Sequence, residues 1–390
     1  MSVNTMGIEQ AYQLVQAIHE QATGQKTIQP TDLSSFISVA TSTLQSGYEN
    51  TLNAITQVLG RTIMAVRPYN EKFKGLEYSA ERWGGITRKI SFADTPALSD
   101  PTYALVDGLS VDQFIVKKPN VLETRYYGSD VYKGQYTIFQ RQLDTAFRSP
   151  EDFASFMSSL MLHFVNERTQ WLENLKRSML ANAIGAKEDM AQDVVHLLTE
   201  YNTDTGLVTP LTSQTVLQPA NYKPFLQWMY ARVSNISRLM TERSELFQQV
   251  ITGKPIMRHT PVEDQKVYML SNFLDGMDAM VLADTYHDNF LRYADVEAVN
   301  YWQAIKDPDE VSVTPVYIDS AGAVKTGTAQ VLTDIVGIMF DRDALGYNIY
   351  QDSLETSPYN ADGQYWNIFH HVRLSLMFDA SEKVVVLQLD

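Results

Sequence analysis

The stretch SPEDFASFMSSLMLHFVNERTQWLENLKRSMLAN, residues 149–182, predicts one long amphipathic helix. Ser149 can cap its N-terminus, Pro150 fits the first helical position, and Glu151 and Asp152 favour the positive end of the helix dipole. At 1.5 Å per residue the helix would be roughly 50 Å long, and we expect Gly185 to end it. Such a helix is a rigid spine for other elements. Its apolar stripe consists of Phe153, Phe156, Met157, Leu160, Met161, Phe164, Trp171, Leu172, Leu175, Met179 and Leu180.

The region before this helix, residues 69–147, has the shorter period of β-strands. Turn signals such as Asp107-Gly108 and Lys118-Pro119-Asn120 separate its segments. Because a two-stranded ribbon is only marginally stable in water, we interpret so long an excursion as a surface for a partner. The predicted strands are ITRKISF (86–92), VDQFIVKK (111–118), VLETRYY (121–127) and YKGQYTIF (132–139).

Helices and strands occupy separate blocks elsewhere, which predicts an α+β protein. Residues 1–33 indicate an arm with short helical pieces, and apolar steps from Phe36 to Leu59 predict a helix that ends at Gly60. The two C-terminal strands are expected to pair through the turn 379–382. The remaining predictions are helices at 223–247 and 271–284, and strands at 267–270, 311–318, 331–340, 369–378 and 383–389.

Composition excludes several classes of protein. The chain has no cysteine, so it forms no disulfide and no thiolate metal site. Its net charge of −15 argues against nucleic acid as a tight, direct ligand. Residues 61–148 carry an excess of three positive charges, which either helps copies to attract one another or is a chance fluctuation. No apolar run reaches the roughly 18 residues of a membrane span, and the N-terminus lacks signal-peptide features, so we expect a soluble, cytoplasmically made protein without a membrane partner.

No motif for catalysis emerges from the sequence. Gly-rich phosphate loops and a GxSxG elbow are missing, and the adjacent His370 and His371 would face opposite sides of a strand. The acidic run 307–310 lacks the spacing of a calcium loop and is interpreted as a solvated turn. We therefore expect no catalytic residue, no metal and no cofactor. A spatial pair of carboxylates among the 46 acidic residues stays open.

The last sixty residues carry a resemblance to a known family. The segment GIMFDRDALG (337–346), then Asn360, Gly363, Tyr365, Asn367 and Phe369, then HHVRLSL (370–376) and KVVVL (383–387), resemble the C-terminal part of tailed-bacteriophage major capsid proteins with the Hong Kong 97 phage fold, most closely the podovirus type. The order of predicted elements agrees along nearly the whole chain. By this resemblance the chain divides into an N-terminal arm (1–62), an extended E-loop (63–148), a peripheral domain with the spine helix (149–215), an axial domain (216–335) and return strands (336–390).

The resemblance implies a structural virion protein rather than an enzyme. Many copies would form hexamers and pentamers of an icosahedral head around double-stranded DNA, without sequence-specific binding. Portal and scaffolding proteins are the implied partners, and the host cytoplasm is the implied place of assembly. Two alternatives stay open: an encapsulin-type nanocompartment shell, and a carboxylate-dependent α+β hydrolase.

Six residues of the E-loop region are the candidates for contact between subunits. Aromatic side chains bury a large area at low entropy cost, although a cluster of tyrosines also suits ordinary strands. Some relatives crosslink an E-loop lysine, but neither lysine here aligns with such a site. The candidates are Phe114, Lys117, Lys118, Tyr126, Tyr127 and Tyr132.

Overall fold

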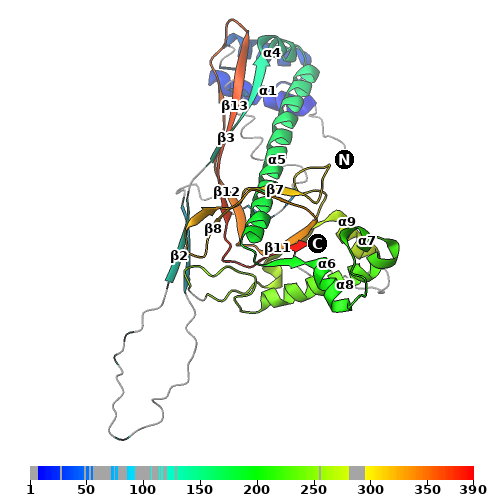
Figure 1. Ribbon diagram of the computed structural model, residues 1–390. Helices are drawn as coiled ribbons and strands as arrows, with labels where there is room; N and C mark the ends of the chain where they lie inside the picture. Colours follow the sequence, from blue (N-terminus) through cyan, green and yellow to red (C-terminus); the bar gives the residue numbers. More distant parts are fainter. Residues whose placement is uncertain are drawn as a thin grey trace.

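A computed structural model gives the architecture of the chain (Figure 1). It describes residues 8–26, 29–47, 50–51, 54–55, 72–73, 75–77, 86–92, 107, 114, 116, 121–127, 130–253, 256–280 and 295–390. The elements form an α+β fold arranged along one long helix, α5.

Helix α5 (Pro150–Asp189) is the predicted spine. It begins where expected, because the Ser149 hydroxyl accepts a hydrogen bond from the Asp152 amide at 3.1 Å. The predicted end at Gly185 is wrong, and the helix runs on to Asp189. Gly185 instead permits a close approach, since a Cβ atom there would overlap the side chain of Val313.

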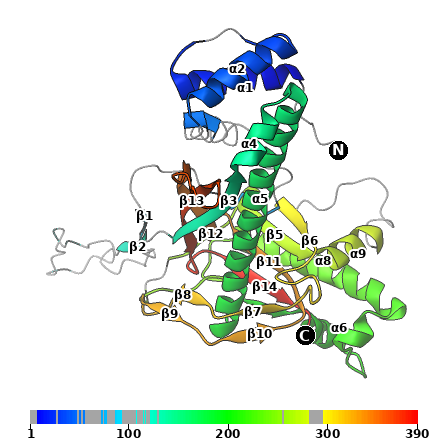
Figure 2. The same cartoon turned by 90° about the horizontal axis from the view of Figure 1, so that it is seen from above.

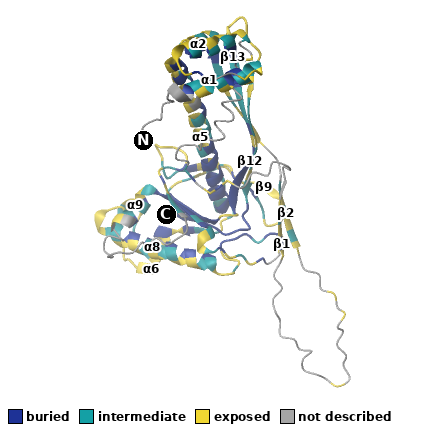
Figure 3. Ribbon diagram, turned by 180° about the vertical axis from the view of Figure 1, so that it is seen from behind, coloured by how far each residue is buried: buried dark blue, intermediate teal, exposed yellow. Residues whose placement is uncertain are grey.

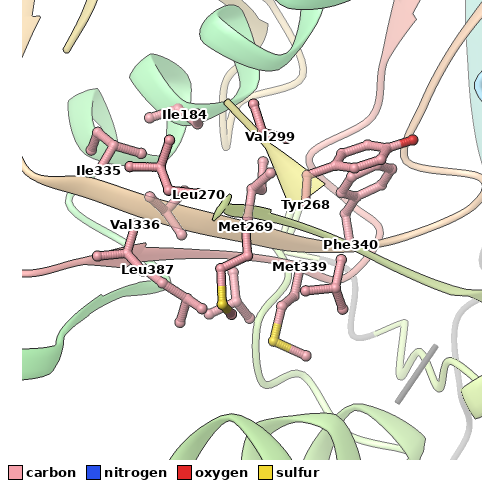
Figure 4. Close-up of a cluster of buried hydrophobic side chains, with 14 of the residues drawn as sticks. Ile184, Tyr268, Met269, Leu270, Val299, Ile335, Val336, Met339, Phe340 and Leu387 are labelled. Atoms are coloured by element: carbon pink, nitrogen blue, oxygen red, sulfur yellow. The ribbon is translucent and has the colours of Figure 1, made fainter. Parts of the chain in front are cut away.

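The C-terminal half of α5 packs on a five-stranded sheet with the order β4-β14-β11-β5-β6. Its central pairs are antiparallel and its two edge pairs are parallel. Figure 4 shows Ile184 of α5 on one side of this sheet and the side chains of Met269 and Met339 pointing to the other. The strands are β4 (Val194–His196), β5 (Gln265–Leu270), β6 (Asp295–Val299), β11 (Ile335–Asp341) and β14 (Val384–Gln388).

Further helices complete this core. Helix α8 (Pro219–Thr241) contributes Met229, Val233 and Ile236 to the same apolar cluster as the sheet. The others are α6 (Leu197–Thr205), α7 (Ser213–Val216), η2 (Val262–Asp264) and α9 (Ser271–Met280). In Figure 3 the buried residues concentrate along α5 and this sheet.

The N-terminal half of α5 supports a second, separate core. A three-stranded antiparallel sheet reaches it. Strands β12 (Leu345–Thr356) and β13 (Tyr365–Phe378) come from the C-terminal part of the chain, whereas β3 (Asp130–Phe139) precedes α5. Helices α1 (Ile8–Thr23), α2 (Leu33–Gln45) and α4 (Gln140–Ala146) close it, and Figure 2 shows α1 and α2 beside this end of α5. The helical pieces expected in the arm therefore pack onto the spine.

A third unit is the ribbon, which we define as strands β1 (Ile86–Phe92) and β2 (Val121–Tyr127). The two strands are antiparallel, with Phe92 opposite Val121. Figure 1 shows the ribbon along one side of the body, away from α1 and α4. Smaller antiparallel pairs are β7 (Val311–Val313) with β10 (Gln330–Leu332) and β8 (Val316–Ile318) with β9 (Val324–Thr326).

Several element predictions need correction. The strand at 311–318 divides at Pro315, and the strand at 331–340 divides near Asp334, whose φ is +61°. The C-terminal strands do not pair, because β13 and β14 belong to different sheets.

Helix boundaries differ as well. The helix predicted at 223–247 spans 219–241, and α2 ends at Gln45, before Gly47 with its φ of +108°. Of the strand predicted at 111–118, only residues 114 and 116 are among those described. Within the described part of the chain, no helix is both long and apolar enough to cross a membrane.

Candidate assembly surfaces

The outer face of the ribbon is apolar and exposed. Strand alternation places Arg88, Ile90 and Phe92 on one face of β1, and Ile90 and Phe92 are 51% and 64% exposed. Directly across on β2 stand Val121 and Glu123. Exposed apolar groups that gather on one face are typical of a surface that binds another protein.

Charged side chains on the same outer face make local ion pairs. The Glu123 carboxylate accepts hydrogen bonds at 2.7 Å from both Arg88 and Arg125, and these bonds hold the pKa of Glu123 below its usual value. All three groups are solvent-accessible, so these pairs contribute little to stability. The apolar residues are therefore the part of this face that gains most from burial against a partner.

The inner face of the ribbon is attached to the body by charge. The Lys89 ammonium lies 2.5 Å from a carboxylate oxygen of Asp379 and also contacts Glu382. Ser91 lies two positions after Lys89 on the same strand, and its hydroxyl accepts a hydrogen bond from Arg258 at 2.7 Å. Arg258 in turn lies 3.4 Å from Glu382.

The two carboxyl groups of this cluster respond differently to burial. Burial opposes ionisation of Asp379, but the charge of Lys89 and hydrogen bonds from Lys89 and Ser381 outweigh it and lower the pKa of that carboxyl. For Glu382 burial dominates, and the charges of Lys89 and Arg258 only partly offset it, so its pKa is raised. Asp379 is therefore the ionised partner of Lys89.

The six predicted contact residues fall in different surroundings. Phe114 is 81% exposed, and Tyr126 is half-buried on the inner side of the ribbon. Tyr127 pairs with Ile86 through the strand backbone. Lys117 and Lys118 lie outside the described residues.

Tyr132, the sixth candidate, is used within the subunit. Its ring packs on Trp171 of α5 with 4.8 Å between centroids, and burial raises the pKa of its hydroxyl. It lies outside the ribbon because β3 joins the sheet of β12 and β13. Its role in contacts between subunits stays a prediction.

The sheet of β12, β13 and β3 has one face against α5. On that face Asp352 accepts a hydrogen bond from His370 at 2.6 Å and pairs with Arg168 of α5 at 2.9 Å. Burial opposes its ionisation, but these two partners outweigh burial and hold the pKa of Asp352 below its usual value. His370 and His371 do face opposite sides of the sheet, as predicted. His370 contacts Asp352 on the face toward α5, whereas His371 lies near Phe369 on the other face.

One cavity bears on the hydrolase alternative. About 400 Å³ in volume, it is lined by Asp309 and Asp334 together with apolar residues of α9 and β11. Burial and the neighbouring charges of Asp309 and Asp390 raise the pKa of Asp334. Both aspartates also make backbone hydrogen bonds. The carbonyl of Asp309 accepts a hydrogen bond from the amide of Ile335, and the carbonyl of Asp334 accepts one from the amide of Leu389. Among the described residues, no group of three histidine or carboxylate side chains could hold a metal.

The sequence profile of the Phi29-like phage major capsid protein family matches residues 15–387. The chain belongs to this family. As a phage major capsid protein, it forms the shell of a virion, which confirms the function predicted from the C-terminal segments.

Solved structures support the fold of this capsid protein. The alignment with the capsid structure of Staphylococcus phage Andhra covers 83% of this chain and 86% of that chain, with 13% identity and a TM-score of 0.55. Coverage and TM-score are the same, at 10% identity, against a structure of the head fibre and inner core protein of native bacteriophage P68. No curated protein sequence matches the chain. The α+β class is confirmed, and the Andhra neighbour is a phage capsid structure, as the resemblance to the Hong Kong 97 phage fold predicted.

No sequence motif predicts the charge cluster beneath the ribbon. Lys89, Arg258, Asp379 and Glu382 come from three distant parts of the chain. The alternation in ITRKISF does place Lys89 and Ser91 on one face, which is the only local signal. The sequence of β1 does not tell which of its two faces is buried, because that depends on contacts with residues far away in the chain.

Proposed function

We propose that this capsid protein builds a closed icosahedral head from hexamers and pentamers, and that the ribbon of each copy lies over a neighbouring copy. The observation that carries the proposal is the outer face of the ribbon, where Ile90 and Phe92 are exposed on a two-stranded unit at the side of the body. Burying these side chains against a neighbour removes apolar area from water.

The proposed contents and partners of the head are those that the resemblance to tailed-phage capsid proteins implies. A net charge of −15 suits a shell that encloses double-stranded DNA without gripping it. Portal and scaffolding proteins complete the particle, which assembles in the host cytoplasm. The chain acts by assembly and carries out no turnover. Weak contacts suffice because they multiply over a closed shell.

We propose that the chain is divided into five structural segments. Residues 1–62 form the arm, 63–148 the E-loop region, 149–215 the peripheral domain with α5, 216–335 the axial domain and 336–390 the return strands. The pairing of β3 with β13 supports a close link between the second and fifth parts. Phe114, Lys117, Lys118, Tyr126, Tyr127 and Tyr132 remain the proposed contact residues of the second part.

Electron microscopy of the purified protein, alone and with a co-expressed scaffold, tests this function. We expect closed shells or rings of five and six copies, and a monomer under all conditions would contradict the proposal. Shells that contain protein cargo in place of DNA would favour the nanocompartment alternative.

Two matched variants test the role of the ribbon. Phe92→Ser should reduce shell yield without lowering the melting temperature, because its side chain is 64% exposed within the subunit. Val208→Ser is the control, since Val208 is fully exposed on the body. Equal yields from both variants would argue against contact through the outer face.

A further inference from the structure

The ribbon meets the body at two neighbouring points, both on the inner face of β1. Lys89 contacts Asp379 and Glu382, and Ser91 accepts a hydrogen bond from Arg258. The two residues lie about 7 Å apart along an extended strand. Two attachments at this separation determine the direction of a strand as well as its position.

The surface that receives Lys89 is held firmly by the body. The turn 379–382 is a part of the backbone network, because the amide of Asp379 donates to Ala344 and the amide of Gln249 donates to Ala380, both at 2.8 Å. The Asp379 side chain also accepts hydrogen bonds from the amide and hydroxyl of Ser381 at 2.9 and 2.7 Å. The carboxylate is thus oriented before Lys89 reaches it.

Arg258 belongs to the same rigid unit. It exchanges two backbone hydrogen bonds with Ser244, at 3.0 and 3.2 Å. The buried Lys383 ammonium donates to the Ser244 hydroxyl at 3.1 Å and to the Glu242 carbonyl at 3.0 Å. Three chain segments, 86–92, 242–258 and 379–383, therefore meet at one site under the ribbon.

Charge makes this attachment specific to one geometry. The side chain of Asp379 is fully buried, so its charge must be compensated by a partner at close range. An apolar contact could slide along the surface at small cost, but Lys89 cannot leave Asp379 without leaving a buried charge unpaired.

We propose that Lys89 is a positioning residue for assembly, which directs the ribbon through its pair with Asp379 so that the outer face meets the neighbouring copy at one angle. This inference rests on the proposed function for its consequence in the shell, but the direction of the ribbon is a property of the single subunit. Arg88, the preceding residue, points outward and pairs only with the ribbon's own Glu123 among the described contacts.

The absence of native cysteine allows a direct test by pulsed electron paramagnetic resonance. Spin labels are placed at Val121→Cys on the ribbon and at Val324→Cys on β9, both exposed positions. Distances are measured on subunits kept below the concentration of assembly. We expect a single narrow distribution in the parent, a broadened or displaced one for Lys89→Met, and the parent distribution for Arg88→Met.

A second variant separates positioning from folding. In Lys89→Met/Asp379→Asn the ion pair is removed from both sides. The amide can still accept from Ser381 and Glu382 keeps Arg258 as its partner, so no unpaired charge is buried. We expect this variant to melt close to the parent temperature while its ribbon distribution is as broad as that of Lys89→Met. The parent distribution in both variants would overturn the proposal.

Shell assembly of the same variants completes the test. We expect Lys89→Met/Asp379→Asn to give fewer or misshapen shells while Arg88→Met behaves as the parent. If the parent forms no shell although the distances respond as expected, the proposed function fails and the positioning role stands. If the parent forms shells and the distances do not respond, only the positioning role fails.

Discussion

Phe36 of α2 packs edge-on against Phe153 of α5, with 5.8 Å between the ring centroids, and both side chains are fully buried. Phe147 adds a second ring against Phe153 at 5.1 Å. This contact joins the N-terminal arm to the beginning of the spine helix, across more than a hundred residues of sequence. The arm is thereby part of the second core of the subunit.

Removing the Phe36 ring should weaken that core. Phe36→Ala deletes a buried aromatic side chain, which typically costs about 3–5 kcal/mol. Denaturant unfolding would measure the loss, and hydrogen exchange should show faster exchange in α1 and α2 than in the five-stranded sheet. Ile37→Ala is the control, because Ile37 is 42% exposed. Equal losses from the two variants would show that the contact contributes nothing of its own.

Gly185 should not tolerate a side chain despite its place inside a helix. At an open helical site, Gly→Ala stabilises by about 1 kcal/mol. Here the new Cβ would overlap Val313, and overpacking costs about 1–3 kcal/mol, so we expect Gly185→Ala to lower the free energy of unfolding. Adding Val313→Ala should restore part of the loss. A stabilised Gly185→Ala single variant would contradict this account of the helix continuing past 185.

Asp189, the last residue of α5, should attach the β7–β10 segment in a pH-dependent way. Its carboxylate accepts hydrogen bonds from the Tyr317 hydroxyl at 2.6 Å and from the hydroxyl and amide of Thr328 at 2.7 and 3.1 Å. These bonds hold the pKa of Asp189 far below its usual 3.8. The ionised group therefore stabilises the fold fully above 3.8, and this contribution is lost as the pH falls toward the folded-state pKa.

The substitution Asp189→Asn tests that sign. We expect it to lower the free energy of unfolding by a constant amount between about pH 7 and about pH 4, and by a smaller amount at still lower pH. Chemical denaturation across this range provides the measurement. Asp307→Asn, at an exposed turn, is the control. A difference from the parent that grows as the pH falls would refute the assignment.

The sequence predicted those features that depend on local chemistry. Ser149 and Pro150 defined the start of α5, and the alternation in 86–92 and 121–127 defined the ribbon strands with their observed bounds. The end of α5 was missed because Gly185 serves a contact with Val313, which lies over a hundred residues away. The separation of β13 and β14 into two sheets was missed for a similar reason, since β14 pairs with β4 and β11 and β13 pairs with the distant β3 as well as with the preceding β12.

Some features of the candidate surfaces were predictable from the sequence and others were not. Aromatic content pointed to the ribbon region, but Tyr132 proved to pack on Trp171 within the subunit. The exposed pair Ile90 and Phe92, and the pairing of Lys89 with Asp379, required the three-dimensional arrangement of three chain segments.

A cryo-electron microscopy reconstruction of the assembled shell would show directly whether the ribbon contacts a neighbouring copy. We expect each ribbon to lie over a neighbouring copy, with Ile90 and Phe92 buried in that contact and Lys89 still paired with Asp379 of its own subunit. A shell in which the ribbons touch only their own subunits, with Ile90 and Phe92 exposed to solvent, would contradict it.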